Sequence, residues 1–365
     1  MTNKLWFQLG VGILLAMLII RLFAEIRSIF NPIIIIAQTI FLPLLIGGVL
    51  FYLFLPMLKK LERRWKFKRW ASILTIVGVI VGALWIFVSI VGPPLTAQVN
   101  ELADNSPEMW DDIQKMSKNV WNQKDKLPDE AEKTINDSFT AAQTKIKNII
   151  VGIGTGIFNI LQGVFQVVLV LILVPFFLIY MLKDHEKLAP FIAKFFHGDK
   201  RQWVRKLLAD IDSTLQAYIR GQVTVSVFVG ILLLIGYLII GLEYALLLAI
   251  FGMFMNVIPF IGPYISVIPA LVIALLQEPK MAIYVAIIML VAQQVESNFI
   301  SPRVMSRALD VHPLTVITVI LAAGNIAGFI GILVAMPAYA VGKVILKNIY
   351  ARRVEIREAV TKEVE

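Results

Sequence analysis

The apolar residues of this chain are gathered into runs of 18 residues or more, instead of being spread along amphipathic stripes. A helix needs about 20 apolar residues to cross the hydrocarbon core of a bilayer. Because lipid cannot hydrogen-bond backbone groups, such runs fold as helices that satisfy their own backbone. The sequence predicts an all-α polytopic membrane protein with eight hydrophobic segments, at about 5–23, 33–58, 70–95, 150–182, 222–242, 244–276, 281–300 and 314–346.

Composition narrows the class of protein further. Hydrophobic residues make up 58% of the chain, charged residues make up 16%, and the net charge is +9. Most of the excess Lys and Arg lies in short loops beside apolar runs, where membrane insertion explains it, so we expect no nucleic-acid partner. The run from Leu5 to Ile20 resembles a signal peptide, but residues 22–26 offer no small-residue cleavage site, so we expect a retained first span.

Motifs for catalysis or cofactor binding are missing. The chain has no cysteine, and its three histidines are scattered in loops without the HExxH spacing of zinc enzymes. The glycines of 152–156 resemble a phosphate loop, but no Lys-Ser/Thr follows, and close helix packing explains them. We therefore expect no enzyme activity, no catalytic residue, no metal site and no cofactor.

Charge in the loops predicts the topology. Residues 59–69 hold seven Lys or Arg against one Glu, and residues 183–206 hold seven against three acids. Residues 96–149 hold ten acids, seven lysines and no arginine. By the positive-inside rule the first two loops are cytoplasmic and the third is extracytoplasmic, with both termini in the cytoplasm.

These assignments divide the chain into five parts. The expected parts are spans 1–3 over 1–95, an extracytoplasmic helical loop over 96–149, the fourth span and a cytoplasmic amphipathic linker over 150–221, a transport core over 222–347, and a cytoplasmic tail over 348–365. Apolar residues at helical spacing in the outer loop favour a helical hairpin packed on the protein, with a lid or partner surface as the alternative. In the linker, an apolar stripe from Trp203 to Tyr218 predicts a helix lying in the lipid interface.

One apolar segment is broken at its centre. Pro259, Gly262 and Pro263 interrupt 244–276, with Asn256 just upstream. Proline inside the membrane leaves backbone groups without a hydrogen-bond partner. Only protein or a water-filled cavity can supply that partner. The half-helix ends beside such a break carry partial charges that can hold a polar or ionic solute.

The last segment repeats this break. The stretch Asn256-Val-Ile-Pro-Phe-Ile-Gly262 is matched by Asn325-Ile-Ala-Gly328-Phe-Ile-Gly331, and Pro-Ala follows each. At about 1.5 Å per residue, each 33-residue segment would reach roughly 50 Å as one helix, against a hydrocarbon core of about 30 Å. Each segment is therefore either a re-entrant hairpin or one kinked, tilted helix. Arg303 and Arg307 lie between the two segments, in the cytoplasm under the hairpin topology and outside under the kinked-helix topology. The positive-inside rule therefore favours hairpins, and hence an inverted repeat.

Polar residues gather at the end of the segment between the breaks: Gln293, Gln294, Glu296, Ser297 and Asn298. A carboxylate near a membrane interior is costly, which suggests an ion ligand or proton carrier. The alternative is that Glu296 faces water at the helix end, one turn before Ser301. Asn256 and Asn325 can bond either freed backbone or solute, and the structural role is the more common one.

These residues resemble the autoinducer-2 exporter family of bacterial membrane proteins. The resemblance is carried by Tyr218-Ile-Arg-Gly-Gln222, Ile258-Pro-Phe-Ile-Gly262 with Pro269, Gln294-Val-Glu296 leading to Pro302, His312-Pro-Leu314, and Gly324, Gly328 and Gly331 before Pro337. It implies an inner-membrane exporter of a small polar solute, with autoinducer-2 as a candidate. Some relatives are assigned sodium or lithium/proton antiport, so H⁺ or Na⁺ are candidate partners. Arg220 and Glu296 are the charged positions that fit the family best.

The leading hypothesis is a secondary transporter that alternates access around the two breaks and the polar cluster. No nucleotide-binding motif is present, so an ion gradient or the solute's own gradient would supply the energy. A non-transporting scaffold or regulator and a passive channel are the alternatives. Small residues suited to close helix contact, such as Gly47 and Gly78, predict a homo-oligomer embedded in lipid.

Overall fold

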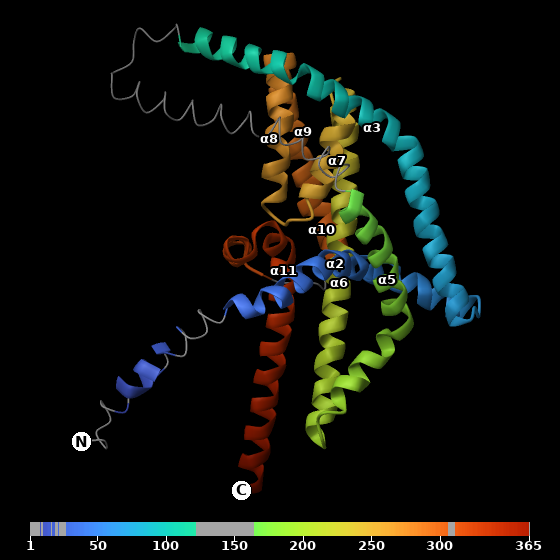
Figure 1. Ribbon diagram of the computed structural model, residues 1–365, viewed down its shortest axis with the longest axis vertical. Helices are drawn as coiled ribbons and strands as arrows, with labels where there is room; N and C mark the ends of the chain where they lie inside the picture. The colour runs from blue at the N-terminus through green and yellow to red at the C-terminus, as the bar shows by residue number, and fades with distance from the viewer. Residues whose placement is uncertain are drawn as a thin grey trace.

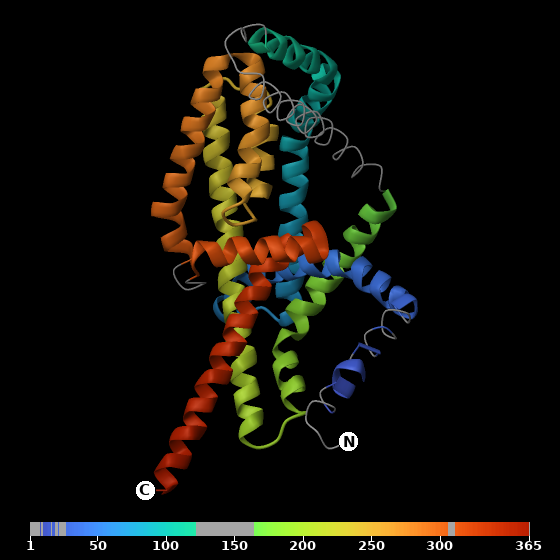
Figure 2. The same ribbon diagram turned by 90° about the vertical axis from the view of Figure 1, so that its left-hand side faces the viewer.

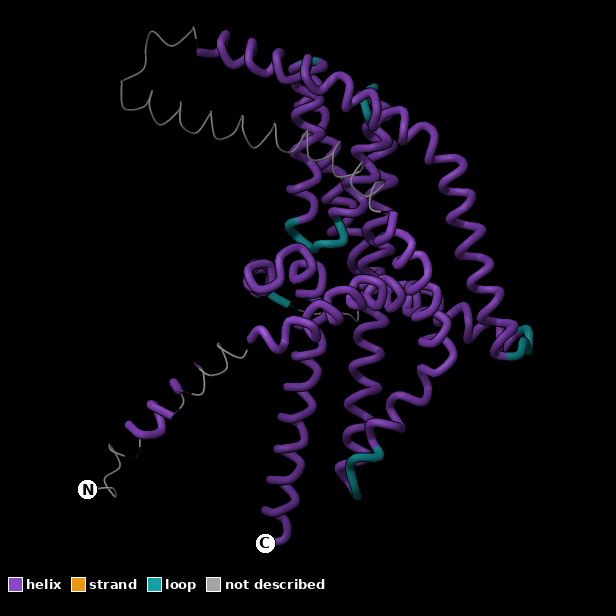
Figure 3. Tube along the Cα trace, viewed as in Figure 1, coloured by secondary structure: helices purple, strands orange, loops and turns teal. Residues whose placement is uncertain are grey.

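The computed structural model describes residues 27–121, 164–305 and 311–364, with parts of 8–21. All regular elements in these residues are helices (Figures 1 and 3). This confirms the all-α expectation. The helices are α2 (Arg27–Arg64), α3 (Arg69–Trp121), α5 (Val164–Ala193), α6 (Asp199–Ile239), α7 (Ala245–Met255), α8 (Gly262–Gln277), α9 (Pro279–Val295), the π-helical η1 (Glu296–Ile300), α10 (Ser301–Met305) and α11 (Pro313–Val364).

The apolar runs of the sequence become helices of membrane length. Among the described residues, five stretches are long and apolar enough to cross a bilayer: Gln38–Arg64, Arg69–Leu102, Asp199–Ile239, Pro279–Val304 and Pro313–Glu355. The helices α7 and α8 are apolar but shorter. About half of segment 5–23, the start of segment 150–182 and residues 122–149 of the predicted outer loop lie outside the described residues.

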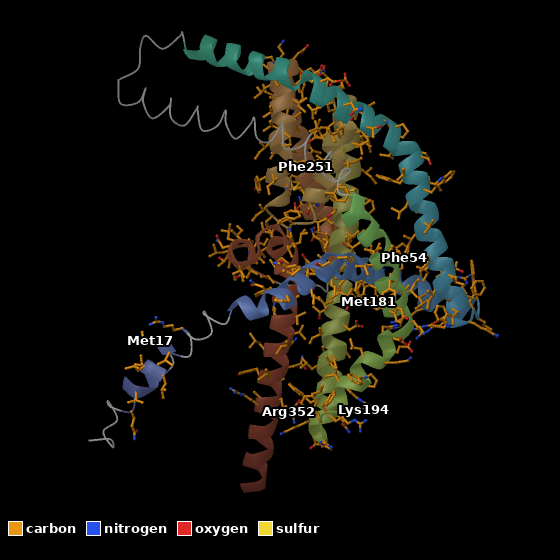
Figure 4. All side chains as sticks on the ribbon, in the orientation of Figure 1. Met17, Phe54, Met181, Lys194, Phe251 and Arg352 are labelled. Carbon is orange, nitrogen blue, oxygen red and sulfur yellow. The ribbon has the colours of Figure 1, made fainter. Side chains whose placement is uncertain are left out.

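The helices α2, α3 and α5 pack together through an apolar core. Its buried residues are Phe51, Leu55, Leu58, Leu61, Ile73, Ile76, Leu178 and Leu182. Phe54 and Met181, labelled in Figure 4, pack against this core where α2 meets α5. A polar junction holds the end of this unit, because Arg69 Nη1 donates to Glu62 Oε1 at 3.1 Å and its Nη2 donates to the Leu182 carbonyl oxygen at 2.7 Å.

The helix α6 is longer than the sequence analysis expects. Residues 199–221, treated there as a linker with a separate interfacial helix, are the first half of one 41-residue helix. That half packs on other helices: Tyr52 Oη donates to Asp212 Oδ1 at 3.0 Å, and Asn348 Nδ2 donates to Asp210 Oδ2 at 3.2 Å. Two residues of the apolar stripe also contact α11: Arg352 lies 5.0 Å from the ring centre of Trp203, and Tyr218 is buried with Val316 and Ile320.

The helix α3 also passes its expected end. It continues beyond Pro93 and Pro94 to Trp121, and Figures 1 and 2 show it bending over one end of α7, α8 and α9. Val99 and Leu102 are buried in the core that α6, α7, α8 and α9 form. The beginning of the predicted outer loop is therefore part of the folded body.

The α5–α6 turn and the C-terminal end of α11 lie at one end of the molecule, and the α8–α9 turn lies at the other end (Figures 1 and 2). This arrangement puts the basic loop 183–206 and the C-terminal tail together, away from the helix ends that α3 covers. It agrees with the separation of charge that the sequence shows.

Candidate functional site

The first predicted break is the turn of a helical hairpin. The helix α7 ends at Met255 and α8 begins at Gly262. The two helices pack antiparallel, since a Cβ added at Gly252 would lie 3.7 Å from Ser266 Cβ and one added at Gly262 would overlap the Met255 carbonyl oxygen. The segment 244–276 is thus a hairpin and not one kinked helix. Figure 3 shows its turn near the middle of the molecule.

Residue chemistry explains this turn. Asn256 ends α7, and Pro263 lies in the first turn of α8, where proline's missing N–H costs nothing. Between them Phe260 adopts φ 63°, and the Ile261 amide donates to the Pro259 carbonyl oxygen at 2.7 Å. Gly262 is required because the two backbones approach too closely for a side chain.

The second break is also a sharp bend of the chain at a glycine. Ala327 and Gly328 leave helical geometry inside α11, with φ 60° at Gly328. A Cβ added at Gly331 would overlap the Ala323 carbonyl oxygen, and one at Gly324 would lie 3.1 Å from Ile332 Cγ1. The chain therefore bends sharply between residues 313–326 and 329–364, and the two limbs touch beside the bend. In Figure 2 the first of these limbs lies across the direction of α6.

The first turn meets the two limbs of α11. Ile258 from the turn shares a buried cluster with Tyr218 of α6 and with Val316, Ile320, Ala335 and Met336 of α11. The second turn takes no part in this contact: Asn325 and Gly328 are exposed, and Asn325 Nδ2 donates only to the Leu321 carbonyl oxygen of its own helix, at 3.1 Å. The Asn325 side chain thus bonds the backbone of its own helix, and the two breaks do not face each other turn to turn.

Polar side chains are buried around the first turn. Gln222 of α6 donates from Nε2 to the Asn256 carbonyl oxygen at 2.7 Å, and Ser266 Oγ donates to the Pro263 carbonyl oxygen at 2.8 Å. Ser226, one helical turn after Gln222, is 2% exposed, as is Asn256. We call Gln222, Ser226, Asn256 and Ser266 the buried polar cluster.

Two atoms of this cluster have no hydrogen-bond partner among the described residues: Asn256 Nδ2 and Ser226 Oγ. Leaving a buried donor unpaired costs about 1–3 kcal/mol, and such groups in a folded protein call for an explanation. A site that receives a polar ligand provides one, since the ligand would supply the missing partners.

The polar residues at the end of α9 form a separate group. Gln293 Nε2 donates to Glu296 Oε2 at 3.0 Å, and Asn298 Nδ2 donates to Gln294 Oε1 at 2.9 Å. Glu296 opens the π-helical turn η1, a local distortion often found at functional sites. No hydrogen bond among the described residues joins this group to the buried polar cluster. Arg220, on α6, is exposed.

The structure thus brings together only part of the predicted site. Asn256, Pro259, Gly262 and Pro263 lie at one turn, where they meet Gln222, Ser226 and Ser266, which the sequence analysis does not predict as site residues. The missed signal was the spacing of Gln222 and Ser226, four residues apart at the start of an apolar span, which puts them on one helix face. Among the described residues no three His, Asp or Glu side chains are grouped to hold a metal ion.

Known proteins resemble this chain along nearly its whole length. The family described as AI-2E family transporter matches residues 11–351. Two Bacillus subtilis proteins named as candidate transport proteins are similar: YueF is 34% identical over 95% of this chain and 94% of its own, and YrrI is 31% identical over 94% and 96%. PerM of Escherichia coli, named as a candidate permease, is 27% identical over 83% of this chain and 86% of its own.

The matched residues include the two motifs that are in contact in the structure. Tyr218 packs against Ile258, and Gln222 donates to the Asn256 carbonyl oxygen. The family match points to a small-solute transporter and away from an enzyme. The chain belongs to the AI-2E family of transporters and is a multi-pass bacterial membrane protein.

Proposed function

We propose that this protein is a secondary transporter of the bacterial inner membrane whose solute binds at the buried polar cluster. The observation that carries the proposal is the pair of unpartnered atoms, Asn256 Nδ2 and Ser226 Oγ, buried where α6 meets the α7–α8 turn. An amide donor and a hydroxyl suit a small polar solute. The turn lies at a helix break, which is the usual position of binding sites in transporters built from broken helices.

Both hairpins would act as re-entrant elements. The α7–α8 hairpin is about 25 Å long at most, which is too short to cross the hydrocarbon core and return fully. Its turn is sealed by the cluster that contains Tyr218, Ile258 and Met336. Alternating access would open this seal on one side and the α7 N-terminal end on the other. Both chain termini would be cytoplasmic.

Export of autoinducer-2 or a similar small polar solute is the favoured transport reaction, because the family name and the resemblance both suggest it. Glu296 is the candidate coupling group. It lies in an apolar span at a π-helical turn and accepts only from Gln293 among the described hydrogen bonds, so it could bind H⁺ or Na⁺. Sodium or lithium/proton antiport is the second candidate function, and it rests on this carboxylate.

Lipid and a second copy of the chain are the further partners expected. Exposed apolar side chains such as Leu84, Trp85 and Leu290 lie on α3 and α9, where they would meet lipid tails. Gly47 approaches Phe177 closely within the chain, so this glycine serves helix packing inside the protomer. Gly78 and Gly82 have nothing within 4 Å of an added Cβ and stay available for a contact between copies.

The test is solute counterflow into proteoliposomes with autoinducer-2, comparing the parent protein with Ser226→Ala and Asn256→Leu. We expect each variant to lose at least tenfold in saturable counterflow. Ser226→Ala should at the same time keep or raise the melting temperature, because it removes an unpartnered buried hydroxyl that costs about 1–3 kcal/mol. Loss of transport without loss of stability identifies a binding group.

Thr318→Val is the matched control, since the Thr318 hydroxyl is exposed and, within the described part of the chain, bonds only to the Leu314 carbonyl oxygen of its own helix. Glu296→Gln should retain counterflow and lose dependence on an imposed ion gradient. Unchanged counterflow in both cluster variants would refute the site. Non-saturable flux would indicate a channel. If there is no flux and the cellular phenotype is kept in these variants, the protein is a scaffold.

A further inference from the structure

The N-terminal end of α7 lacks a cap of its own. Its N-cap residue, Tyr244, adopts left-handed geometry with φ 54° and makes no side-chain capping bond. The first amides of a helix have no partner inside it. One of these amides, on Leu247, donates instead to Gln98 Oε1 of α3 at 3.0 Å. A residue almost 150 positions earlier therefore caps this helix.

A second hydrogen bond joins the same two elements. Asn105 Nδ2 of α3 donates to Tyr244 Oη at 3.1 Å. Between the two bonds, Val99 is 7% exposed and Leu102 is 3% exposed, both within the core of α6 to α9. The positions 98, 102 and 105 recur at helical spacing, so one face of α3 makes all these contacts. This part of α3, residues 98–105, is called the strap.

The other end of the hairpin is held in a similar way. Gln277, the last residue of α8, accepts from the Glu243 amide through Oε1 at 3.0 Å and donates from Nε2 to the Gly241 carbonyl oxygen at 2.9 Å. Both outer ends of the α7–α8 hairpin are thus fixed by amide side chains. Of these three hydrogen bonds at the outer ends, the one at the start of α7 comes from outside the hairpin and its flanking turn.

We propose that Gln98 and Asn105 are positioning residues for transport: the strap sets the depth of α7 and so the place of Asn256 in the buried polar cluster. The helix α7 has 11 residues and is about 16 Å long. A short, stiff helix transmits a displacement of its start to its end. This inference rests on the proposed function, because it assigns the strap a role at that site.

The proposal can be tested by changing one atom of the cap, the Gln98 side-chain oxygen that accepts from the Leu247 amide. Leu247 donates, so Gln98 acts through its acceptor oxygen. Gln98→Glu keeps an acceptor there, and Gln98→Met removes it at nearly the same size. Asn105→Ala removes the second bond. Thr96→Val is the matched control on the same helix, because the Thr96 hydroxyl bonds, among residues that the structure describes, only to the carbonyl oxygens of Gly92 and Pro93.

The first readout needs no transport. The chain has no cysteine, so Ser266→Cys provides a single thiol in the buried polar cluster of the full-length protein in detergent. We expect N-ethylmaleimide to label it at least threefold faster when Gln98→Met or Asn105→Ala is added, and at the parent rate with Gln98→Glu or Thr96→Val. Equal or slower labelling in both Gln98→Met and Asn105→Ala would overturn the proposal.

The second readout is autoinducer-2 counterflow, measured in variants that keep serine at position 266. Gln98→Met should raise the solute KM at least fivefold with less than a twofold change in maximal rate, and Gln98→Glu should restore the parent KM. A drop in maximal rate with unchanged KM would mean a general structural role and would overturn the assignment. If no variant or parent moves solute, the proposed function fails while the labelling result still decides the strap.

Discussion

At the scale of single residues, two glycines determine where the chain reverses. Gly262 and Gly331 each lie where an added Cβ would overlap a backbone carbonyl oxygen of the preceding helix, that of Met255 or that of Ala323. A backbone atom cannot move aside as a flexible side chain can. These two bends therefore depend on a glycine beside a backbone atom, whereas the nearest neighbours of Gly230, Gly236 and Gly252 are side-chain atoms.

Replacing Gly262 by Ala should lower stability by about 1–3 kcal/mol, the usual cost of overpacking. The melting temperature in detergent should fall clearly, and the loss should be seen without any transport assay. Gly78→Ala is the control, because nothing lies within 4 Å of an added Cβ there and alanine favours a helix interior by up to about 1 kcal/mol. If both variants melt at the same temperature, the close approach at Gly262 is wrong.

At the scale of elements, packing decides where helices begin and end. The prolines at 93 and 94 do not end α3, and the polar residues before Gln222 do not separate a linker from α6. Both extensions find partners: the α3 extension contacts α7, and the start of α6 contacts α2 and α11. The turn between α7 and α8 differs in this respect, because local backbone chemistry at Phe260 and Gly262 sets where the chain reverses.

The hairpin arrangement predicts that residues 301–312 are cytoplasmic. With no native cysteine, Ser306→Cys should resist an impermeant thiol reagent added outside intact cells and react once the membrane is permeabilised. Ser106→Cys, in the predicted outer loop, should react from outside and serves as the positive control. Labelling of Ser306→Cys from outside would contradict the topology with two re-entrant hairpins.

At the scale of the whole molecule, one polar junction ties α2, α3 and α5 into a unit. Arg69 binds Glu62 and the Leu182 carbonyl oxygen, and its Nη2 lies 2.9 Å from His185 Nδ1. Arginine can only donate, so Nδ1 accepts from Arg69 when His185 is neutral, whereas a protonated Nδ1 could donate only to the Leu182 carbonyl oxygen, 3.2 Å away. Burial lowers the pKa of His185, the Leu182 carbonyl oxygen opposes this shift, and the nearby Arg69 charge adds to it.

This unit should therefore weaken at low pH. His185 lies beyond the apolar part of α5, and its folded pKa is below the usual value of about 6.5. As the pH falls, His185 binds a proton in the unfolded chain before it does so in the folded one. The stability is therefore full above the unfolded pKa and decreases as the pH drops from the unfolded pKa toward the folded pKa. The melting temperature in detergent should decline from pH 7.5 to pH 5. His185→Gln, which keeps an acceptor, should flatten the decline; an unchanged slope would assign it to other groups.

The sequence by itself determined the class of protein, the positions of its apolar helices and the two breaks. These follow from local chemistry: apolar runs must be helical in lipid, proline cannot donate, and the paired glycines mark a close approach. The α7–α8 hairpin was predictable for the same reason. The resemblance carried by Tyr218 to Gln222 and Ile258 to Gly262 led to the family that the comparison shows.

Only the tertiary structure decided which polar residues meet. Gln222 and Ser226 belong to a different helix from Asn256, and nothing local to either segment encodes their contact. For the same reason, three further arrangements could not be predicted from the sequence. These are the separation of Glu296 from the α7–α8 turn, the exposure of Asn325 and the contact of Gln98 with α7. Contacts between residues 34 or 149 positions apart arise from how helices pack, and helix packing depends on all the faces that are buried together.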